Sequence, residues 1–495
     1  MTTGTAVREV ERKYELPPGR ELPALSGLPG VASETPPDTV ALDAVYYDTA
    51  DLRLLRHGLT LRRRRGGDDA GWHLKIPAGT ATRTEIRMPT QDSLPDQLVS
   101  LVRSYTRAAP LAPQARLHTD RIRRRLLADD GTVLAEVVVD SVHATGPDGR
   151  PHAWAEVEAE LAAGTRELAD AIEARLRDVG IPRSASPAKV ARVLSVPHQA
   201  APGVTRRSSA GEVVGAYLRE QVAALAAGDV AVRRDTPDAV HRTRVAARRA
   251  RSTLRTYRAL FREPVRALDG ELGWLGTQLG AARDVEVQWV RLVTRLNEVP
   301  DLAGDGARAR LDRVFGERAE RARGLAIEAL DSDRYLRLLD ALDAVLEAVD
   351  TGKAKRRATK VIPKMLAAAV TTVDDRVRAA HGAPSGHERD ELVHRVRKAA
   401  KRLRYAIEAT RPLYPVAAHT ALARFTALQD LLGEHQDAVV AQAQLRELAA
   451  ESSDGFVLGV LYQQEKEIAA AQVAQLDRTW RRARRAVSAS LARQP

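Results

Sequence analysis

The chain has 495 residues, with 77 Lys and Arg against 65 Asp and Glu and a formal net charge of +12. This length predicts two or three domains, and the basic excess favours an anionic partner such as nucleic acid, a membrane surface or a phosphate compound. Cysteine is absent, which excludes disulfides and thiolate metal sites, and we expect a cytoplasmic protein because no apolar run of about 18 residues and no secretory leader occurs.

The first predicted strand has one side on which every second residue is charged. Within residues 7–16, Glu9, Glu11 and Lys13 share one face, because successive side chains of a strand point to opposite faces. Two carboxylates at such a short separation repel each other unless a positive group lies between them. Hard cations such as Mg²⁺ bind such carboxylates together with water and phosphate oxygens. Taken alone, the run is more typical of a solvated strand face than of a metal site.

One-sided charge recurs in the strands that follow. The charged positions are Arg62 and Arg64, His73 and Lys75, Arg83, Glu85 and Arg87, Arg121, Arg123 and Arg125, Glu136 and Asp140, and Glu156, Glu158 and Glu160. A sandwich with a charged exterior is one interpretation. The other is a closed antiparallel barrel, whose lumen collects alternate residues from every strand. We favour the barrel because cationic walls would bind a polyanion while acidic walls would hold a metal.

Helical patterns end this part of the chain, at residues 165–179 and again at 184–194, where Lys189 lies. A Pro/Gly/Ser-rich stretch follows, and apolar residues then recur at helical spacing only. The sequence therefore predicts an α+β two-domain chain. Its parts are an N-terminal β tunnel with flanking helices (5–197), a linker (198–210) and an all-α bundle (211–490).

The order of the N-terminal motifs resembles the CYTH domain, the family of triphosphate tunnel metalloenzymes, over residues 5–197. The resemblance rests on Glu9-x-Glu11-x-Lys13, Arg62 with Arg64, Trp72-His73-Leu74-Lys75 and Glu156-x-Glu158. It implies an eight-stranded antiparallel tunnel that binds a triphosphate with Mg²⁺ or Mn²⁺. Members hydrolyse inorganic triphosphate, thiamine triphosphate or RNA 5′-triphosphates, and some cyclise ATP.

Carried over position by position, the resemblance implies roles for individual residues. It implies catalytic roles for Glu9, Glu11, Lys13, Lys75 and Glu85, substrate contacts by Arg62, Arg64, Arg121, Arg123 and Lys189, and metal ligation by Glu9, Glu11, Asp140, Glu156 and Glu158. Two points stay open. The ligating pair is either Glu156 with Glu158 or Glu158 with Glu160. On the arginine strand, both Arg121 and Arg123 are available for the phosphate contact. Phosphoryl transfer needs positioning and charge neutralisation more than a nucleophilic side chain.

The helical half contains an internal duplication. Residues 239–251 match 392–404, and residues 279–284 match 432–437, with the same spacing between the two segments in both copies. Equal spacing predicts a duplicated helical hairpin, related by a pseudo-twofold axis.

Each copy has a basic stripe at helical spacing. The stripes are His241, Arg244, Arg248 and Arg251 in the first copy, and His394, Arg397, Lys401 and Arg404 in the second. Like charges at this spacing destabilise a helix by a few tenths of a kcal/mol per pair, so a duplicated stripe indicates an anionic ligand rather than a solvated face. Two histidines make a poor metal site, and we interpret them as phosphate contacts, with core histidines as the alternative.

These H-x-x-R-x-x-x-[RK]-R-x-R helices, with their L-G-x-x-x-D partners, resemble the CHAD domain over residues 208–490. The resemblance implies a two-repeat helical bundle whose basic cleft binds inorganic polyphosphate. We therefore expect an inorganic triphosphatase that binds polyphosphate and associates with polyphosphate granules. The alternatives are a non-catalytic polyphosphate scaffold and a thiamine or nucleoside triphosphatase. We disfavour a nucleic-acid binder, because only Tyr257 and Tyr405 lie near the basic helices to stack on bases.

Overall fold

The computed structural model describes residues 5–78, 82–194, 203–262, 265–300, 305–349, 351–450 and 455–492; of these, the side chains of 5–9, 305–307 and 489–492 are not described. The chain forms two compact units, residues 1–200 and 201–495. Within the described ranges, no helix combines the length and the apolar character needed to cross a membrane.

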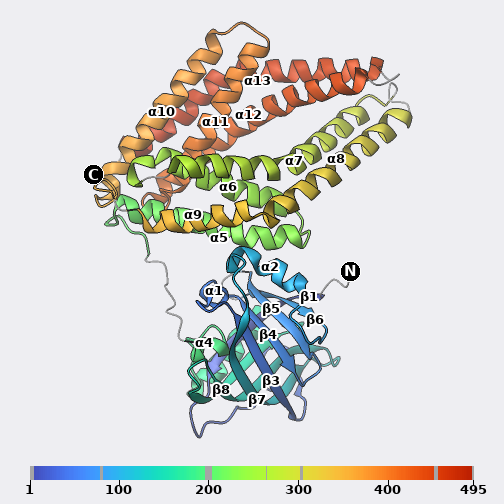
Figure 1. The fold of residues 1–495 in the computed structure, drawn as a ribbon, viewed down its shortest axis with the longest axis vertical. Helices are drawn as coiled ribbons and strands as arrows, with labels where there is room; N and C mark the ends of the chain where they lie inside the picture. Colours follow the sequence, from blue (N-terminus) through green and yellow to red (C-terminus); the bar gives the residue numbers. More distant parts are fainter. Residues whose placement is uncertain are drawn as a thin grey trace. The chain divides into compact units, whose positions relative to one another are not determined.

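The first unit is a closed antiparallel barrel (Figure 1). Its strands are β1 (Thr5–Glu15), β2 (Ser33–Glu34), β3 (Asp38–Asp48), β4 (Thr60–Arg65), β5 (Gly71–Pro77), β6 (Thr82–Met88), β7 (Ala112–Leu127), β8 (Val133–Thr145) and β9 (Pro151–Leu161). The neighbours run β7-β3-β4-β5-β6-β1-β9-β8, and β8 pairs with β7 to close the ring, while the short β2 adds to β7. The predicted eight-stranded antiparallel tunnel is confirmed.

The barrel turns apolar side chains outward, under a helix. Helix α3 (Arg166–Asp178) buries Ile172 and Leu176 against Tyr14 of β1 and Val157 of β9. Neighbouring residues of a strand point to opposite faces, so Tyr14 and Lys13 lie on opposite faces of β1. Because α3 covers the face with Tyr14, the charged face with Lys13 points into the lumen. This inversion of the usual strand pattern explains why strand after strand has a purely charged side.

One end of the lumen is closed by helix α4 (Lys189–Val193). Val190 and Val193 of this helix are buried against Tyr46, Leu117 and Val142, which come from β3, β7 and β8. The apolar contacts fix α4 in the mouth of the barrel. Its first residue therefore enters the lumen, as described below.

Helix α4 is shorter than the helix predicted at 184–194. The backbone N–H of Ser184 donates to the carbonyl oxygen of Lys13 at 2.8 Å, so the chain first runs along β1. Pro187 then disfavours helical geometry at Ser186. Two further helices flank the barrel, α1 (Arg53–Arg56) and α2 (Asp96–Thr106).

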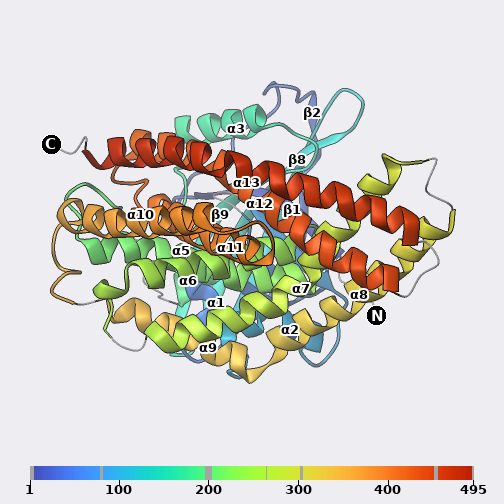
Figure 2. The same ribbon diagram turned by 90° about the horizontal axis from the view of Figure 1, so that it is seen from above.

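The second unit is entirely helical among its described residues (Figure 2). Its helices are α5 (Ala210–Arg233), α6 (Ala239–Thr256), η1 (Arg258–Leu260), α7 (Val265–Asn297), α8 (Asp305–Asp331), α9 (Asp333–Glu347), α10 (Ala358–Gly382), α11 (His387–Glu408), α12 (Pro415–Ala450) and α13 (Gly455–Ala492). The matched segments lie on α6 and α7 in the first copy and on α11 and α12 in the second. The helical bundle with internal duplication is confirmed.

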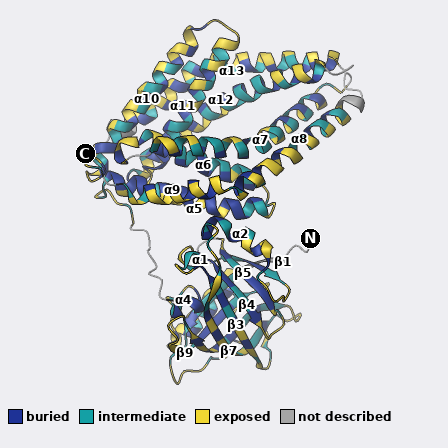
Figure 3. Ribbon diagram, viewed as in Figure 1, coloured by how far each residue is buried: buried dark blue, intermediate teal, exposed yellow. Residues whose placement is uncertain are grey.

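Helices α6 and α11 pack against each other, so the two copies of the basic motif meet. Their buried faces are rich in alanine, including Ala246, Ala250 and Ala399, which lets the helix backbones approach closely. Tyr257 donates a 2.8 Å hydrogen bond to the carbonyl oxygen of Ala406 across this contact. Figure 3 shows the same division in the other helices, with buried inner sides and exposed outer sides.

The predicted linker, residues 198–210, falls partly outside the described part, which resumes at residue 203. Ser209 is the N-cap of α5. Its side chain accepts from the backbone N–H of Glu212 at 3.2 Å, and the Glu212 carboxylate accepts from the backbone N–H of Ser209 at 2.6 Å. This reciprocal capping box starts the helical unit one residue before the predicted position.

The turn between β4 and β5 depends on a glycine, which gives a first prediction. Gly66 has φ +81°, and a Cβ there would overlap the carbonyl oxygen of Ala41. We expect Gly66→Ala to lower the free energy of unfolding by at least about 2 kcal/mol, because the left-handed backbone costs about 1–2 kcal/mol before any clash. Gly149→Ala is the matched control, since Gly149 has φ +71° and nothing within 4 Å of its Cβ position. Equal losses in denaturant unfolding would contradict the role of the clash.

Candidate metal and phosphate sites

The charged faces of the strands surround a lumen cavity of about 530 Å³. The predicted residues that line it are Glu11, Lys13, Arg62, Arg64, Lys75, Glu85, Arg121, Arg123, Glu158 and Lys189. Asp140 and Glu156 are buried among the same side chains, at contact distance from Lys189. The side chain of Glu9 lies outside the described part of the chain. The lumen thus brings together all the predicted tunnel residues whose side chains are described.

Glu85 organises the cations on one side of the lumen. This carboxylate of β6 is buried, with its oxygens 3.7 Å from Arg62 of β4 and 3.8 Å from Lys75 of β5, and it also pairs with Arg87. Shared ion pairs lower the cost of burying like charges together. Three strands therefore present their cations to one cavity.

A group of three carboxylates lies on β8 and β9. Ligand oxygens of Asp140, Glu156 and Glu158 all lie within 4.8 Å of one another. Lys189 contacts all three, at 2.8 Å, 2.9 Å and 2.5 Å. Arg121 donates to both oxygens of Asp140, at 2.8 and 2.7 Å, and to Glu158 at 3.0 Å.

The cations favour the ionised form of two members of this group, Glu158 and Asp140. Burial opposes ionisation of Glu158, but Lys13, Lys189 and Arg121 outweigh burial and hold its pKa well below the usual value. Burial likewise opposes the charge on Asp140, and Lys189 with Arg121 lowers its pKa. An all-oxygen set of carboxylates is the ligand type that Mg²⁺ and Mn²⁺ accept. The donor set therefore fits the divalent metals that the sequence resemblance implies.

Glu11 faces this group from β1. Its carboxylate lies 2.6 Å from Lys13 and 3.7 Å from Lys75. The pKa of Glu11 is lowered overall. Burial and the nearby Glu158 act to raise it, but the positive charges of Lys13 and Lys75 outweigh them. Glu160, the alternative ligand, pairs with Glu11 in the β1–β9 register and lines the cavity outside the three-carboxylate group.

The two arginines of β7 have different surroundings. Arg121 contacts the buried carboxylates, whereas Arg123 pairs with Asp38 at 2.6 Å and with Asp68 at 2.9 Å. Both acids are largely exposed. Arg123 thus lies in a more solvated part of the lumen than Arg121.

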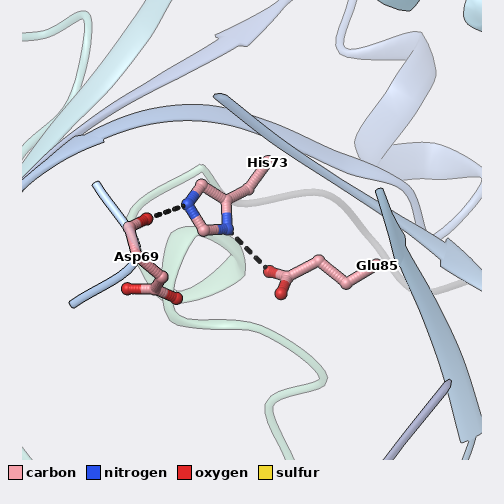
Figure 4. Close-up of side chains that lie close together, drawn as sticks. All are labelled: Asp69, His73 and Glu85. Carbon is pink, nitrogen blue, oxygen red and sulfur yellow. Dashed lines mark hydrogen bonds and ion pairs between the residues drawn. The ribbon is translucent and has the colours of Figure 1, made fainter. Parts of the chain in front are cut away.

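A second group, Asp69, His73 and Glu85, was not assigned from the sequence. Figure 4 shows the His73 ring between the other two: Nε2 lies 2.7 Å from the carbonyl oxygen of Asp69 and Nδ1 lies 3.0 Å from Glu85. Because a carbonyl oxygen only accepts, Nε2 donates, and both ring nitrogens are engaged. His73 therefore holds the β4–β5 turn to Glu85. The one sequence signal was its place on the charged face of β5.

The second unit has its own cavity, of about 610 Å³, lined by α6, α7, α11 and α12. The predicted residues that line it are His241, Arg244, Arg248, Arg251, His394, Arg397 and Lys401. The two basic stripes therefore face one space, as the duplication suggested. Gly280 and Asp284 of α7 explain the L-G-x-x-x-D motif, because the glycine leaves room for the Arg244 guanidinium and the aspartate binds it at 2.8 Å.

Arg404 is not among the residues that line this cavity, and Arg402 takes part instead. Arg404 pairs with Glu408 at 3.3 Å, and Glu408 also accepts from Arg249 at 2.9 Å. Glu408 occupies the position in α11 that Arg255 occupies in α6. The second stripe is therefore followed by an acid, and the two copies differ at this end.

At the centre of the cavity, cations lack acidic partners. Within the described residues, no carboxylate lies within 4.0 Å of Arg248, Arg397 or Lys401, although Arg248 bonds the Tyr405 hydroxyl at 2.8 Å. Burial lowers the pKa of Lys401 to about 6, and the like charges of Arg397 and Arg248 act in the same direction. An uncompensated, partly buried cation cluster is suited to an anion.

Comparisons with known proteins agree with both halves. The CYTH family model matches residues 7–194, and the CHAD family model matches residues 216–446. Uncharacterized proteins from two strains of Mycobacterium tuberculosis are each 38% identical to this chain, over 97% of it and 97% of their own length.

Two solved structures are also similar. PptA from Streptomyces chartreusis is 24% identical, covers 55% of this chain and 100% of its own, and has a TM-score of 0.47. The CHAD domain of the plant Ricinus communis is 28% identical, covers 60% of this chain and 96% of its own, and also has a TM-score of 0.47. By the family matches and the M. tuberculosis relatives, the chain belongs to the family of proteins in which a CYTH domain precedes a CHAD domain.

The environment of Lys401 predicts a stability effect. Its folded pKa of about 6 lies below the ordinary value of 10.5, so between these values the unfolded chain binds more protons and stability rises with pH. We expect Lys401→Met to stabilise the helical unit at pH 7. The advantage over wild type should shrink towards pH 9, by up to about 1.4 kcal/mol per pH unit.

Denaturant unfolding followed by the helical signal at pH 7 and pH 9 measures this difference. Lys398→Met is the control, because Lys398 lines the same cavity but is exposed. A loss of stability in Lys401→Met at pH 7 would contradict the prediction.

Proposed function

We propose that the tunnel hydrolyses inorganic triphosphate with Mg²⁺ or Mn²⁺, and that the helical cavity binds inorganic polyphosphate. CYTH proteins are triphosphatases or cyclases, so the family gives the tunnel a hydrolase or lyase kind of activity. The observation that carries the finer proposal is the lumen itself. Cations from β4, β5 and β7 surround one cavity, Glu11 of β1 and Glu158 of β9 line it, and Glu158 belongs to the group that it forms with Asp140 and Glu156.

The lumen's own residues would bind and orient the substrate. Arg62, Lys75 and Arg121 would contact phosphate oxygens, and charge neutralisation of this kind is most of what phosphoryl transfer requires. A divalent cation held by Asp140, Glu156 and Glu158 would supply Lewis-acid polarisation of the phosphate oxygens. Closure of one end by α4 would limit the water that reaches the bound chain.

The lining favours an inorganic substrate over thiamine triphosphate or a nucleotide. Among the described residues that line the cavity, Tyr46 is the single aromatic, and its hydroxyl lies 3.3 Å from Arg62. It is buried, so it offers no open ring face to a base or a thiazole. Phosphate oxygens, in contrast, would find cations on β1, β4, β5 and β7.

A non-catalytic scaffold is the second candidate, favoured by the acidic partners that already neutralise the lumen cations. The two candidates differ in a single assay. Purified full-length protein is given inorganic triphosphate, thiamine triphosphate, ATP and long-chain polyphosphate, with and without Mg²⁺. Metal-dependent release of phosphate supports hydrolysis, and polyphosphate binding without turnover supports the scaffold.

The carboxylates should be essential for turnover. We expect Glu11→Gln combined with Glu158→Gln to lower metal-dependent hydrolysis of triphosphate by at least about a hundredfold, because the amides remove two ligand charges at constant volume. Phosphate release at saturating Mg²⁺ is the measurement, with the fold checked by circular dichroism. Glu136→Gln is the control, because Glu136 lines the cavity but pairs with Arg125 at 3.4 Å, away from the three-carboxylate group. Near-wild-type turnover in the double variant would refute hydrolysis in the tunnel.

Polyphosphate binding in the helical cavity should depend on salt. By analogy with phosphate-backbone binding, log affinity falls with log salt in proportion to the number of phosphate contacts. We expect Arg248→Ala with Arg397→Ala to flatten this slope by about two. Arg404→Ala should leave it unchanged, since Arg404 lies outside the lining and pairs with Glu408.

Titrations of long-chain polyphosphate at several salt concentrations give the slopes. Equal slopes in the wild type and the double variant would show that the cavity does not hold the chain.

A further inference from the structure

Lys189 contacts all three carboxylates of the group on β8 and β9, and Lys13 of β1 pairs with two of them, Glu156 and Glu158. The Lys189 ammonium lies 2.8 Å from Asp140, 2.9 Å from Glu156 and 2.5 Å from Glu158, and its side chain is 9% exposed. These are the carboxylates whose donor set fits a divalent metal. The Lys189 ammonium therefore already occupies the place where a divalent metal would bind to these carboxylates.

The position of Lys189 is fixed from outside the group. It is the first residue of α4, whose Val190 and Val193 are buried in the apolar end of the barrel. Ala188 and Lys189 also line the lumen cavity. The side chain can therefore reach either the carboxylates or the cavity without moving the helix.

An ammonium and a divalent cation cannot both keep contacts of this length with the same three oxygens. At such separations the two positive charges repel each other strongly, and burial weakens the screening. Each carboxylate must then exchange one cation for the other. Other partners of the group would stay, because Arg121 approaches Asp140 and Glu158 from β7.

We propose that Lys189 competes with the divalent metal for Asp140, Glu156 and Glu158, and that metal binding turns its ammonium towards the lumen, where it meets phosphate. This inference rests on the proposed metal-dependent function. It makes Lys189 a positioning residue that couples metal binding to anion binding. The three carboxylates exchange an ammonium for a divalent cation, and the lumen cavity gains the Lys189 ammonium as a further positive charge. The affinity for metal is lower than the bare carboxylates would give.

The neighbouring tryptophan supplies a reporter. Trp154 of β9 donates to Glu156 at 2.7 Å, packs beside α4 and lies 5.3 Å from the Arg192 guanidinium, measured to the ring centroid. When Lys189 leaves Glu156, the environment of this indole changes. Emission should therefore respond to Mg²⁺ in the wild type and lose that response in Trp154→Phe.

The main test is equilibrium binding of Mn²⁺ alone to full-length protein, measured by calorimetry or by the resonance signal of free Mn²⁺. We expect Lys189→Met to bind at least about tenfold more tightly than wild type, since it removes a unit charge in contact with the ligands. Lys189→Arg, which keeps the charge, should stay within about threefold of wild type. Arg125→Met is the matched control, because Arg125 is a lumen cation that pairs with Glu136 instead.

The outcomes separate the two ideas. If Lys189→Met binds Mn²⁺ no more tightly than Arg125→Met, the competition is refuted while metal binding stands. If neither wild type nor Lys189→Met binds Mn²⁺, both the competition and the proposed metal-dependent function fail. Should Lys189→Met not fold, the wild-type Mg²⁺ titration decides: tryptophan emission that is unchanged, or that changes equally in Trp154→Phe, overturns the inference.

Discussion

Mutual neutralisation of buried charges is the constraint on which the barrel depends. A lumen lined by arginine, lysine and glutamate would be costly if any charge stood alone, because an unpaired buried ion loses several kcal/mol of hydration. The structure avoids this by sharing: Glu85 serves cations of three strands, and Lys189 serves three carboxylates. The outward apolar faces then supply the packing that a charged interior cannot, with Tyr14 and Val157 buried under α3. Removing one partner is therefore expected to disturb several others.

In the helical cavity, by contrast, the central cations are not neutralised by neighbouring acids. Around Arg248, Arg397 and Lys401, cations gather without an acid in contact among the described residues, and the depressed pKa of Lys401 reports the strain. Such an arrangement costs stability, and a bound anion would relieve that cost. In the tunnel the charges are neutralised by ion pairs within the lumen, whereas the cavity presents open positive charge. The first arrangement suits selective chemistry on a short anion, and the second suits holding a long one.

Much of the fold could be predicted because it follows from periodicity. Alternation along β1 placed Glu11 and Lys13 on the inner face, and equal spacing of the repeats placed His241 and His394 at one cavity. The stripe spacing alone did not decide which cations reach the cavity. It selected Arg404, but Glu408 lies four residues further along the same helix and pairs with the Arg404 guanidinium, so the sequence carried this signal as an i,i+4 pair. Helix α2 was missed although its buried leucines and valine follow a helical pattern.

The two copies of the duplicated hairpin have diverged, so a residue's role in one copy does not always predict the role of its counterpart in the other. Arg255 in α6 bonds Asp269, while its counterpart in α11 is Glu408, which accepts from Arg249 across the contact between the two helices. An arginine in place of Glu408 would bring a like charge against Arg249 where α6 and α11 pack. The acid instead joins the two copies, and Tyr217 donates a 2.9 Å hydrogen bond to it. The copies therefore differ where these two helices meet, while cations of both stripes line one cavity.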